Sequence, residues 1–283
     1  MKKLSSLKFG TFLCIASVAA IFTGTMDALA VEKNESAGGG NVAPKATVSE
    51  QNGSNEISNP ACIPSGIRHK PGTTSWQLTE QAKAQKEGQT VPVLFLGDSI
   101  TQCWSFAADN KYPGGLDSWN KYFKPMGAVN FGISADLTEH VLWRVTDGEQ
   151  LKINPKIVIL LIGTNNLHRA KKADSSAQVA EGIKFIVDAI RQKSPDSKIL
   201  LLGLLPRSWD ATASKKVGEV NSIIAGYADN KQVFYFDASP FLLDKSGNIS
   251  KEIFRDGIHL SPLGYELFAQ ALLPEIKKLQ ETK

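Results

Sequence analysis

Five short apolar runs recur along the chain from position 91 onward, and longer mixed segments separate them. The runs cover Val91–Gly97, Ala128–Phe131, Lys156–Gly163, Lys198–Gly203 and Gln232–Asp237. Each run has the length and composition of a buried strand, and the intervening segments are long enough for crossover helices. Alternating strands and helices favour a parallel sheet that is covered on both faces. The pattern therefore predicts one α/β domain with five strands.

The clearest helix is predicted between the third and fourth runs. Its apolar positions recur at three- and four-residue spacing, at Val179, Ile183, Ile186, Val187 and Ile190. Ser175 and Gln178 form a capping-box pattern at its start, and Ser194 before Pro195 marks its end. A last helix is expected from about Pro262 to Leu279. Both helices would pack on the sheet through their apolar stripes.

The amino terminus has the pattern of an export signal. Lys2, Lys3 and Lys8 precede an apolar stretch from Phe12 to Phe22, and Ala28–Ala30 has the small-x-small form of a cleavage site. The stretch is about half of the roughly 20 residues that a membrane span needs. We expect residues 1–30 to be a signal peptide cleaved near Ala30, which would place the protein in a periplasm or outside the cell.

Residues 31–60 are rich in Gly, Ser, Asn, Glu and Ala and hold almost no bulky apolar side chains. Such a segment cannot bury enough surface to order itself. It is predicted to be a flexible linker, and residues 61–283 are predicted to be the folded domain.

Charge and cysteine content restrict the possible partners. The net charge is +4, and removal of the predicted signal would leave 29 basic and 27 acidic residues. This balance, without a long basic cluster, gives no indication of a nucleic-acid partner. Cys62 and Cys103 would remain after cleavage, and either a disulfide or two separate thiols fits the sequence. No spacing typical of a metal site or a nucleotide-binding loop is present.

Candidate chemistry lies at both ends of the predicted domain. The first apolar run ends in Gly97-Asp98-Ser99, and Asp256 and His259 lie three residues apart near the carboxyl end. A serine hydroxyl becomes a nucleophile when an imidazole takes its proton and a carboxylate orients that imidazole. Ser99, His259 and Asp256 are therefore the candidate catalytic residues.

Acyl transfer by serine also needs donors for the developing oxyanion. The second run closes at Phe131-Gly132, and the third is followed by Thr164-Asn165. Since the carboxyl ends of parallel strands meet at one edge of the sheet, the Gly132 N–H and the Asn165 amide are the expected donors.

Together, Gly97-Asp98-Ser99-Ile100, Gly132, Gly163-Thr164-Asn165 and Asp256-x-x-His259 resemble the four blocks of the SGNH, or GDSL, hydrolase family. The likeness is strongest to the catalytic subunits of platelet-activating factor acetylhydrolase and their bacterial relatives, over roughly Pro92 to Leu279. It implies a flavodoxin-like three-layer α/β/α fold and an esterase or acylhydrolase without metal or cofactor. It also implies that the Ser99 N–H joins Gly132 and Asn165 in the oxyanion hole.

Other positions near these blocks are candidates for the rim of the site or for structural roles. Cys103 stands where relatives often have glycine, so the rim beside the nucleophile is expected to differ, with Asp98, Trp104 and His168 as candidate rim residues. Ser134 is a rival nucleophile, but Asp136 stands where a Gly-x-Ser-x-Gly elbow needs glycine. A structural role is favoured for His140.

The expected function is an exported esterase that removes a short acyl group, with acetyl favoured, from a carbohydrate or a phospholipid. Transfer of the acyl group to a glycan is an alternative, because the same acyl-enzyme serves either acceptor. A non-catalytic glycan-binding module is the alternative outside enzymology. A homodimer is possible, since relatives pair.

Overall fold

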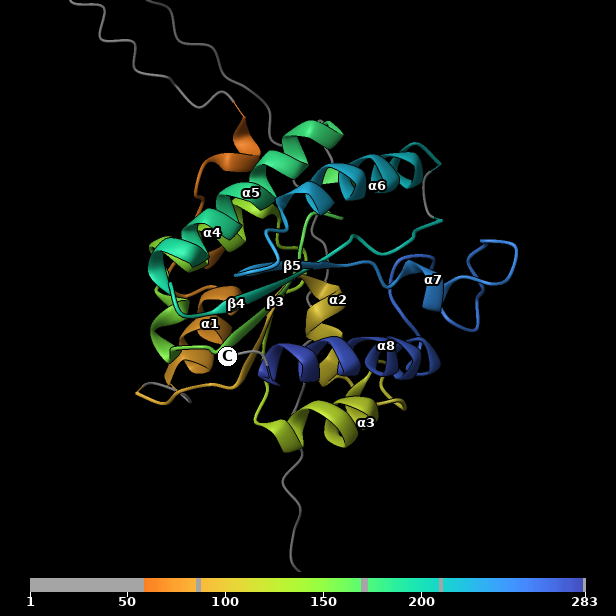
Figure 1. Cartoon of the computed structure of the whole chain (residues 1–283), viewed down its shortest axis with the longest axis horizontal. Coiled ribbons are helices and arrows are strands. Elements are labelled where there is room, and N and C mark those ends of the chain that lie inside the picture. The colour runs from red at the N-terminus through yellow and green to blue at the C-terminus, as the bar shows by residue number, and fades with distance from the viewer. Residues whose placement is uncertain (1–58, 85–87, 169–172, 209–210, 282–283) are drawn as a thin grey trace, which may run out of the picture. The chain divides into compact units, whose positions relative to one another are not determined.

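The computed structural model of the chain describes residues 59–84, 88–168, 173–208 and 211–281 (Figure 1). The predicted signal peptide, and the predicted linker up to residue 58, lie outside the described residues. Asn59 and Pro60 are not linker, contrary to expectation. Pro60 begins a short 3-10 turn that Asn59 caps, and Asn59 also donates to Glu181 Oε2 at 2.8 Å. Short-range composition cannot reveal that contact, because Glu181 is far along the chain.

Five parallel strands form a single sheet in the order β2-β1-β3-β4-β5. Their bounds are β1 Val93–Gly97, β2 Val129–Gly132, β3 Ile157–Leu161, β4 Lys198–Leu202 and β5 Val233–Phe236. All five predicted strands are confirmed, and the strand order is that of flavodoxin-like folds. The strand burial explains the apolar runs, since every residue of β1 and β3 is buried.

Helices cover both faces of the sheet (Figure 1). On one face lie α4 (Thr138–Thr146), α5 (Ser176–Lys193) and α6 (Ala211–Ile224). On the other lie α2 (Ser99–Gln102), α3 (Leu116–Ser118) and α8 (Pro262–Glu281). The remaining α-helices are α1 (Thr74–Ala84) and α7 (Ser239–Leu242). The predicted three-layer α/β/α arrangement is confirmed.

The two helices predicted in detail form where expected. Ser175 caps α5 by accepting the Gln178 N–H, and the Gln178 side chain accepts the Ser175 N–H, as the capping-box pattern indicated. The apolar stripe of α5 is buried, and α8 starts at the predicted Pro262. No helix among the described residues is long and apolar enough to cross a membrane.

Residues 59–84, which we call the N-terminal strap, precede the first strand and pack along α4 and α5. Ala61 O accepts from Thr138 Oγ1 at 3.0 Å, and the Ser65 N–H donates to Glu139 O at 3.0 Å. His69 stacks on Trp143, with ring centroids 5.4 Å apart and planes 4° from parallel. The strap is thus joined to the body of the domain at several separate points.

The order of the strands changes side between β1 and β3. β2 is added on one side of β1, and the later strands are added on the other. At such a switch point the loops after the two central strands diverge and leave a crevice at their carboxyl ends. Ser99 follows β1 and Asn165 follows β3. The topology therefore brings two predicted site residues to the same crevice.

Candidate active site

Ser99 is the first residue of α2, directly after β1, and is partly accessible. Asp98 caps this helix, since its Oδ1 accepts the Ile100 N–H at 2.9 Å. From the other end of the chain, His259 approaches with Nε2 2.8 Å from Ser99 Oγ. A hydroxyl and an imidazole 160 residues apart in the chain are thus within hydrogen-bond distance.

Asp256 fixes the orientation of His259. Its Oδ2 lies 2.8 Å from His259 Nδ1, while its Oδ1 accepts the backbone N–H groups of His259 and Ile258 at 2.7 and 3.0 Å. Burial alone would raise the pKa of Asp256, but the backbone and imidazole N–H groups of His259 outweigh it and hold that pKa below its usual value. Asp256 is therefore held as a carboxylate that keeps the proton of His259 on Nδ1.

This Ser-His-Asp arrangement has the connectivity that nucleophilic catalysis requires. With Nδ1 protonated toward Asp256, His259 Nε2 is free to accept the proton of Ser99 Oγ. The His259 side chain is 25% exposed and that of Asp256 is 46% exposed, so the pair lies at the surface where a substrate can enter.

Asn165 lies in the loop after β3. Its Nδ2 donates to the Asp136 backbone oxygen at 2.9 Å and lies 3.5 Å from Asp98 Oδ2. The second contact is at the outer limit of a hydrogen bond, so the second amide hydrogen stays available to a better acceptor.

Burial raises the pKa of Asp98 to about 7 despite the hydrogen bond from the Ile100 N–H.

The direction of the Gly132 backbone N–H differs from the one that we expected. Backbone groups alternate along a strand, and the Ile133 N–H donates toward β1, to Gly97 O at 3.1 Å. The Gly132 N–H consequently points to the outer edge of β2, where it donates to Asn130 Oδ1 at 2.9 Å. The prediction that this N–H is an oxyanion donor is wrong. What requires glycine here is space, because a Cβ would lie 2.1 Å from the Gln102 backbone nitrogen in α2.

The turn that follows β2 presents a different N–H group. The Asp136 N–H donates to Ile133 O at 3.2 Å and closes a four-residue turn in which Ala135, at the third position, has φ 61°. This position of a type II turn normally holds glycine, and a non-glycine residue with positive φ costs about 1–3 kcal/mol. Within the described part of the chain, no protein acceptor takes the Ala135 N–H.

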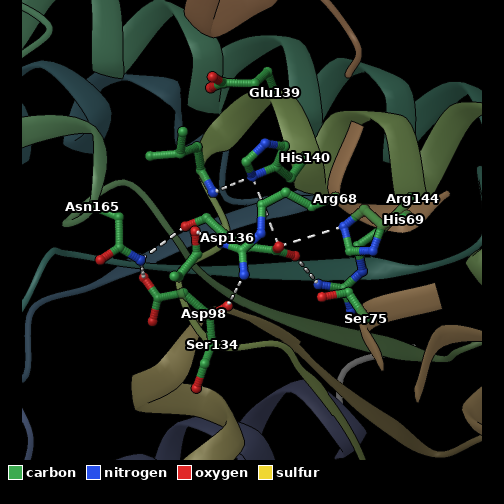
Figure 2. A network of polar contacts seen from close by, with 12 residues as sticks. Arg68, His69, Ser75, Asp98, Ser134, Asp136, Glu139, His140, Arg144 and Asn165 are labelled. Atoms are coloured by element: carbon green, nitrogen blue, oxygen red, sulfur yellow. Dashed lines mark hydrogen bonds and ion pairs between the residues drawn. The ribbon is translucent and has the colours of Figure 1, made fainter. Parts of the chain in front are cut away.

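Asp136 lies at the centre of a buried charged network that the sequence did not reveal (Figure 2). Its Oδ2 pairs with Arg144 Nη1 at 2.8 Å and its Oδ1 lies 3.4 Å from His69 Nε2, with all three side chains fully buried. His140 Nδ1 is 3.8 Å away. Burial would raise the pKa of Asp136, but His69, Arg144 and His140 outweigh it and lower that pKa. The turn after β2 therefore contains a buried carboxylate, that of Asp136, which is ionised.

Two of the three candidate rim residues lie in the interior, so the expectation is wrong for both. Asp98 is 1% exposed and acts as the helix cap described above. Trp104 is also 1% exposed, and its ring contacts Tyr265 and Phe268 with centroids 4.5 and 5.7 Å away. A 3-10 turn after α2 directs Trp104 inward against α8. The third, His168, is exposed, and its place at a pocket rim stays a prediction.

The remaining polar candidates have structural partners. Ser134 Oγ and its backbone N–H both donate to Gln102 Oε1, so this rival nucleophile contacts an amide and no base. His140 Nδ1 accepts the Leu137 N–H at the start of α4, which fits the favoured structural role. Cys62 and Cys103 are both buried, free thiols. No group of three metal-ligating side chains occurs among the described residues.

A hollow of about 460 Å³ adjoins the exposed carboxylate of the Ser-His-Asp arrangement. Its lining combines the polar side chains of Asp256, Arg255, Lys251 and Ser208 with the apolar side chains of Ile249 and Phe254.

The sequence of the chain matches a known protein family. The sequence profile of the GDSL-like Lipase/Acylhydrolase family matches residues 95–267, which span Ser99, Asn165, Asp256 and His259. The chain belongs to this family. Its members are acylhydrolases, so the chain is a carboxylic ester hydrolase, as the sequence predicted.

Individual relatives agree with the family. The chain is 34% identical over 217 residues to platelet-activating factor acetylhydrolase IB subunit alpha1 of Homo sapiens, covering 76% of this chain and 88% of the relative. Among solved structures it is similar to a GDSL-like lipase from Bacteroides thetaiotaomicron, with a TM-score of 0.59, 18% identity, and coverage of 72% and 98%. A carbohydrate acetylesterase family member from Sinorhizobium meliloti has a TM-score of 0.54, 16% identity, and coverage of 69% and 100%. The structural likenesses support the GDSL-hydrolase fold.

Proposed function

We propose that this acylhydrolase is an exported serine esterase that removes short acyl groups, acetyl foremost, through an acyl-enzyme on Ser99. The observation that carries the proposal is the continuous chain of contacts from Ser99 Oγ to His259 Nε2 and from His259 Nδ1 to Asp256, each 2.8 Å.

The reaction follows from these contacts. His259 Nε2 takes the proton of Ser99 Oγ as the oxygen attacks the ester carbonyl, and it returns the proton to the departing alkoxide, which leaves as the alcohol. Water then attacks the acyl-enzyme and gives its proton to His259, and the carboxylic acid is released as Ser99 recovers its hydrogen. Asp256 stabilises the imidazolium in both steps without taking a proton itself.

Three donors are assigned to the developing oxyanion. The Ser99 N–H has no acceptor within its own helix because it is the first residue of α2. The second hydrogen of the Asn165 amide has only its long contact with Asp98. The Ala135 N–H replaces that of Gly132, because it is without an acceptor and lies in the turn whose Asp136 carbonyl contacts Asn165.

The acyl preference rests on the relatives, one of which is by name an acetylhydrolase of platelet-activating factor. The alcohol is assigned to the polar class, with acetylated sugars foremost, because Arg255, Lys251 and Ser208 offer hydrogen-bonding groups in the hollow beside Asp256, next to the apolar surface of Ile249 and Phe254. Export is part of the proposal and is supported by the lysines, apolar stretch and Ala28–Ala30 pattern of residues 1–30.

The deciding experiment measures hydrolysis of p-nitrophenyl acetate, butyrate and octanoate by the chain from Val31, with Ser99→Ala beside it. We expect kcat/KM to fall as the acyl chain lengthens, and we expect Ser99→Ala to lose at least ~10⁴-fold while it keeps the wild-type melting temperature. Thermal unfolding of the variant is the control for folding. Unchanged hydrolysis in Ser99→Ala would refute the assignment.

Substrate class is tested with the same enzyme on acetylated xylose and on an acetylated glycerophospholipid. Faster release of acetate from the sugar supports the polar-alcohol assignment, whereas faster release from the phospholipid contradicts it and leaves the Ser99 chemistry intact. Free acetate is measured directly, so that transfer to a second sugar would be recognised by consumption of ester without acid.

A further inference from the structure

Arg68 comes from the N-terminal strap, which precedes the part of the chain that the family profile matches. Its guanidinium nevertheless reaches the turn after β2. Nη2 donates to Ser134 O at 3.0 Å, and Nη1 donates to Ala135 O. One side chain thus holds two successive carbonyls of the turn that contains Ala135.

These two contacts determine the direction of the Ala135 N–H. The Ser134 carbonyl and the Ala135 N–H belong to one peptide unit, and in a planar trans peptide they point in opposite directions. When Arg68 holds the Ser134 oxygen, the Ala135 N–H must point away from Arg68. Asn165 contacts the same turn, because its Nδ2 donates to the carbonyl of Asp136, the residue that follows Ala135, at 2.9 Å.

The turn needs such a restraint because of its own conformation. Ala135 has φ 61°, which a residue with a side chain adopts only when its surroundings impose it. Three other contacts hold neighbouring groups. Gln102 accepts the Ser134 N–H, Asn165 donates to the Asp136 carbonyl, and Arg144 pairs with the Asp136 carboxylate. Among these contacts, only those of Arg68 act on the carbonyl of the peptide that carries the Ala135 N–H.

The strap gives Arg68 a fixed base. His69, the next residue, is fully buried between the Trp143 ring and the Asp136 carboxylate. Upstream, the strap donates the Ser65 N–H to Glu139 O and accepts from Thr138 Oγ1 at Ala61 O. Arg68 is therefore held from both sides along its own chain.

We propose that Arg68 is a positioning residue for the esterase reaction: its fork on the Ser134 and Ala135 carbonyls orients the Ala135 N–H toward the oxyanion of an ester attacked by Ser99. This inference rests on the proposed function. Because the oxyanion forms only as the reaction proceeds, the contribution of Arg68 belongs to kcat and not to substrate binding.

The test compares Arg68→Ala and Arg68→Lys with wild type on p-nitrophenyl acetate. Arg191→Ala is the matched control, since Arg191 on α5 is also a partly exposed arginine but pairs with Asp229, at 3.2 Å. We expect Arg68→Ala to lower kcat by about 10- to 100-fold, as misplacement of a catalytic group by about an ångström does, with KM changed less than about threefold. Arg68→Lys should recover only part of kcat, because an ammonium group lacks the planar fork. Arg191→Ala should match wild type.

Chemical rescue separates positioning from a purely structural role. Millimolar guanidinium chloride should raise the kcat of Arg68→Ala, because the ion can occupy the vacated place beside the two carbonyls, and it should not raise that of Arg191→Ala. A loss confined to KM, or a kcat for Arg68→Ala equal to that of Arg191→Ala, would overturn the inference. The inference would also be overturned if Arg68→Ala lost both kcat and melting temperature and guanidinium did not restore its kcat.

If Arg68→Ala does not fold, Arg68→Lys decides, because it keeps the aliphatic stem. A reduced kcat in folded Arg68→Lys supports the inference, and a wild-type kcat overturns it. Failure of the proposed function is a separate result. It would show as absence of ester hydrolysis in wild type, or as hydrolysis that survives Ser99→Ala, before Arg68 is considered.

Discussion

At the scale of single residues, Asp98 shows how burial changes a side chain next to the proposed nucleophile. Its neighbour Ser99 is partly accessible, yet Asp98 itself is 1% exposed and has no cation as a partner in any described contact. The carboxyl is instead solvated by one backbone N–H and a distant amide. That environment disfavours the charged form, and the consequence is a dependence of stability on pH.

We expect the wild type to lose stability relative to Asp98→Asn as pH rises from about 4 to about 7. Because the pKa of Asp98 is raised from 3.8 to about 7 in the folded state, the folded protein binds the extra proton in this interval. Stability that is present below the unfolded pKa is then lost as pH passes through the folded one. The full effect is on the order of 4 kcal/mol for a shift of this size.

Urea unfolding of both proteins between pH 4 and pH 8 measures this difference. Asp244→Asn is the control, because backbone N–H groups, led by that of Asn248, lower the pKa of Asp244. Its difference from wild type should be flat over the interval, since its titration lies below the interval. A flat difference for Asp98→Asn as well would show that the Asp98 carboxyl is not destabilised by burial.

Residues that follow a strand end or belong to a short motif could be proposed from the sequence. Ser99, Asn165, and the pair Asp256 and His259 are such residues. The fold brings Ser99 and His259 within hydrogen-bond distance, and the catalytic roles of all four stay a prediction. Prediction from sequence failed where the role of a residue depends on the direction of its backbone N–H or its side chain. Gly132 has the right place but the wrong backbone orientation, and Trp104 turns inward because a 3-10 turn changes the phase of the helix. His69 gave no signal because its partner Asp136 lies far along the chain.

At the scale of elements, α2 must lie close against β2 for Ser99 to stand at the carboxyl end of β1. Gly132 permits this approach, because only a residue without a Cβ leaves room for the α2 backbone at Thr101 and Gln102. Tyr265 on α8 fixes the other side, donating from its hydroxyl to Ile100 O at 2.7 Å. The position of Ser99 is thus set by packing between elements as much as by the turn itself.

Gly132→Ala should therefore destabilise the fold and displace α2. The added Cβ would lie 2.1 Å from the Gln102 nitrogen and 2.5 Å from the Thr101 carbonyl carbon, and both are backbone atoms that cannot rotate away. Overpacking of this kind costs about 1–3 kcal/mol, which lowers the melting temperature by about 2–4 °C for each kcal/mol in a domain of this size. Thermal unfolding followed by circular dichroism measures the change.

Gly218→Ala is the matched control for that variant. Gly218 lies within α6, and a Cβ there would meet nothing within 4 Å. The same substitution should leave the melting temperature unchanged or raise it, because alanine loses less entropy than glycine on forming a helix. Equal melting temperatures for Gly132→Ala and wild type would contradict the steric role assigned to Gly132.

Prediction of the elements was accurate because the central strands β1 and β3 are wholly buried, the edge strands β2 and β5 are apolar and partly buried, and the long helix α5 has an apolar stripe. The five apolar runs and the capping box at Ser175 carry that information locally. The sequence placed residues 61–84 in the folded domain, but it did not reveal how the strap contacts the rest of that domain. Its contacts with α4 and α5, through Asn59 and Ala61 among others, are made by polar groups that show no periodicity.

At the scale of the whole molecule, the strap makes the domain larger than the region that the family profile covers. The profile begins at residue 95, whereas the first described residue is Asn59. The segment between carries Arg68 and His69, which contact the turn and the buried carboxylate beside the proposed oxyanion site. The functional unit, on these contacts, starts well before the first strand.

Truncation tests where the functional unit starts. A chain of residues 59–283 should keep the melting temperature and kcat/KM of the chain from Val31, because it retains the Asn59 contact with Glu181 and all later strap contacts. A chain of residues 88–283 should lose stability and most of its kcat, because Asp136 loses His69 and the Ser134 carbonyl loses Arg68. The buried pair of Asp136 and Arg144 would then be opened to water on the side that His69 now covers. Unfolding curves and ester hydrolysis of the three chains measure both effects.

Equal kcat in the two truncated chains would mean that the turn after β2 holds its conformation without the strap. A reduced kcat in the chain of residues 59–283 would mean that residues before Asn59 act at the site.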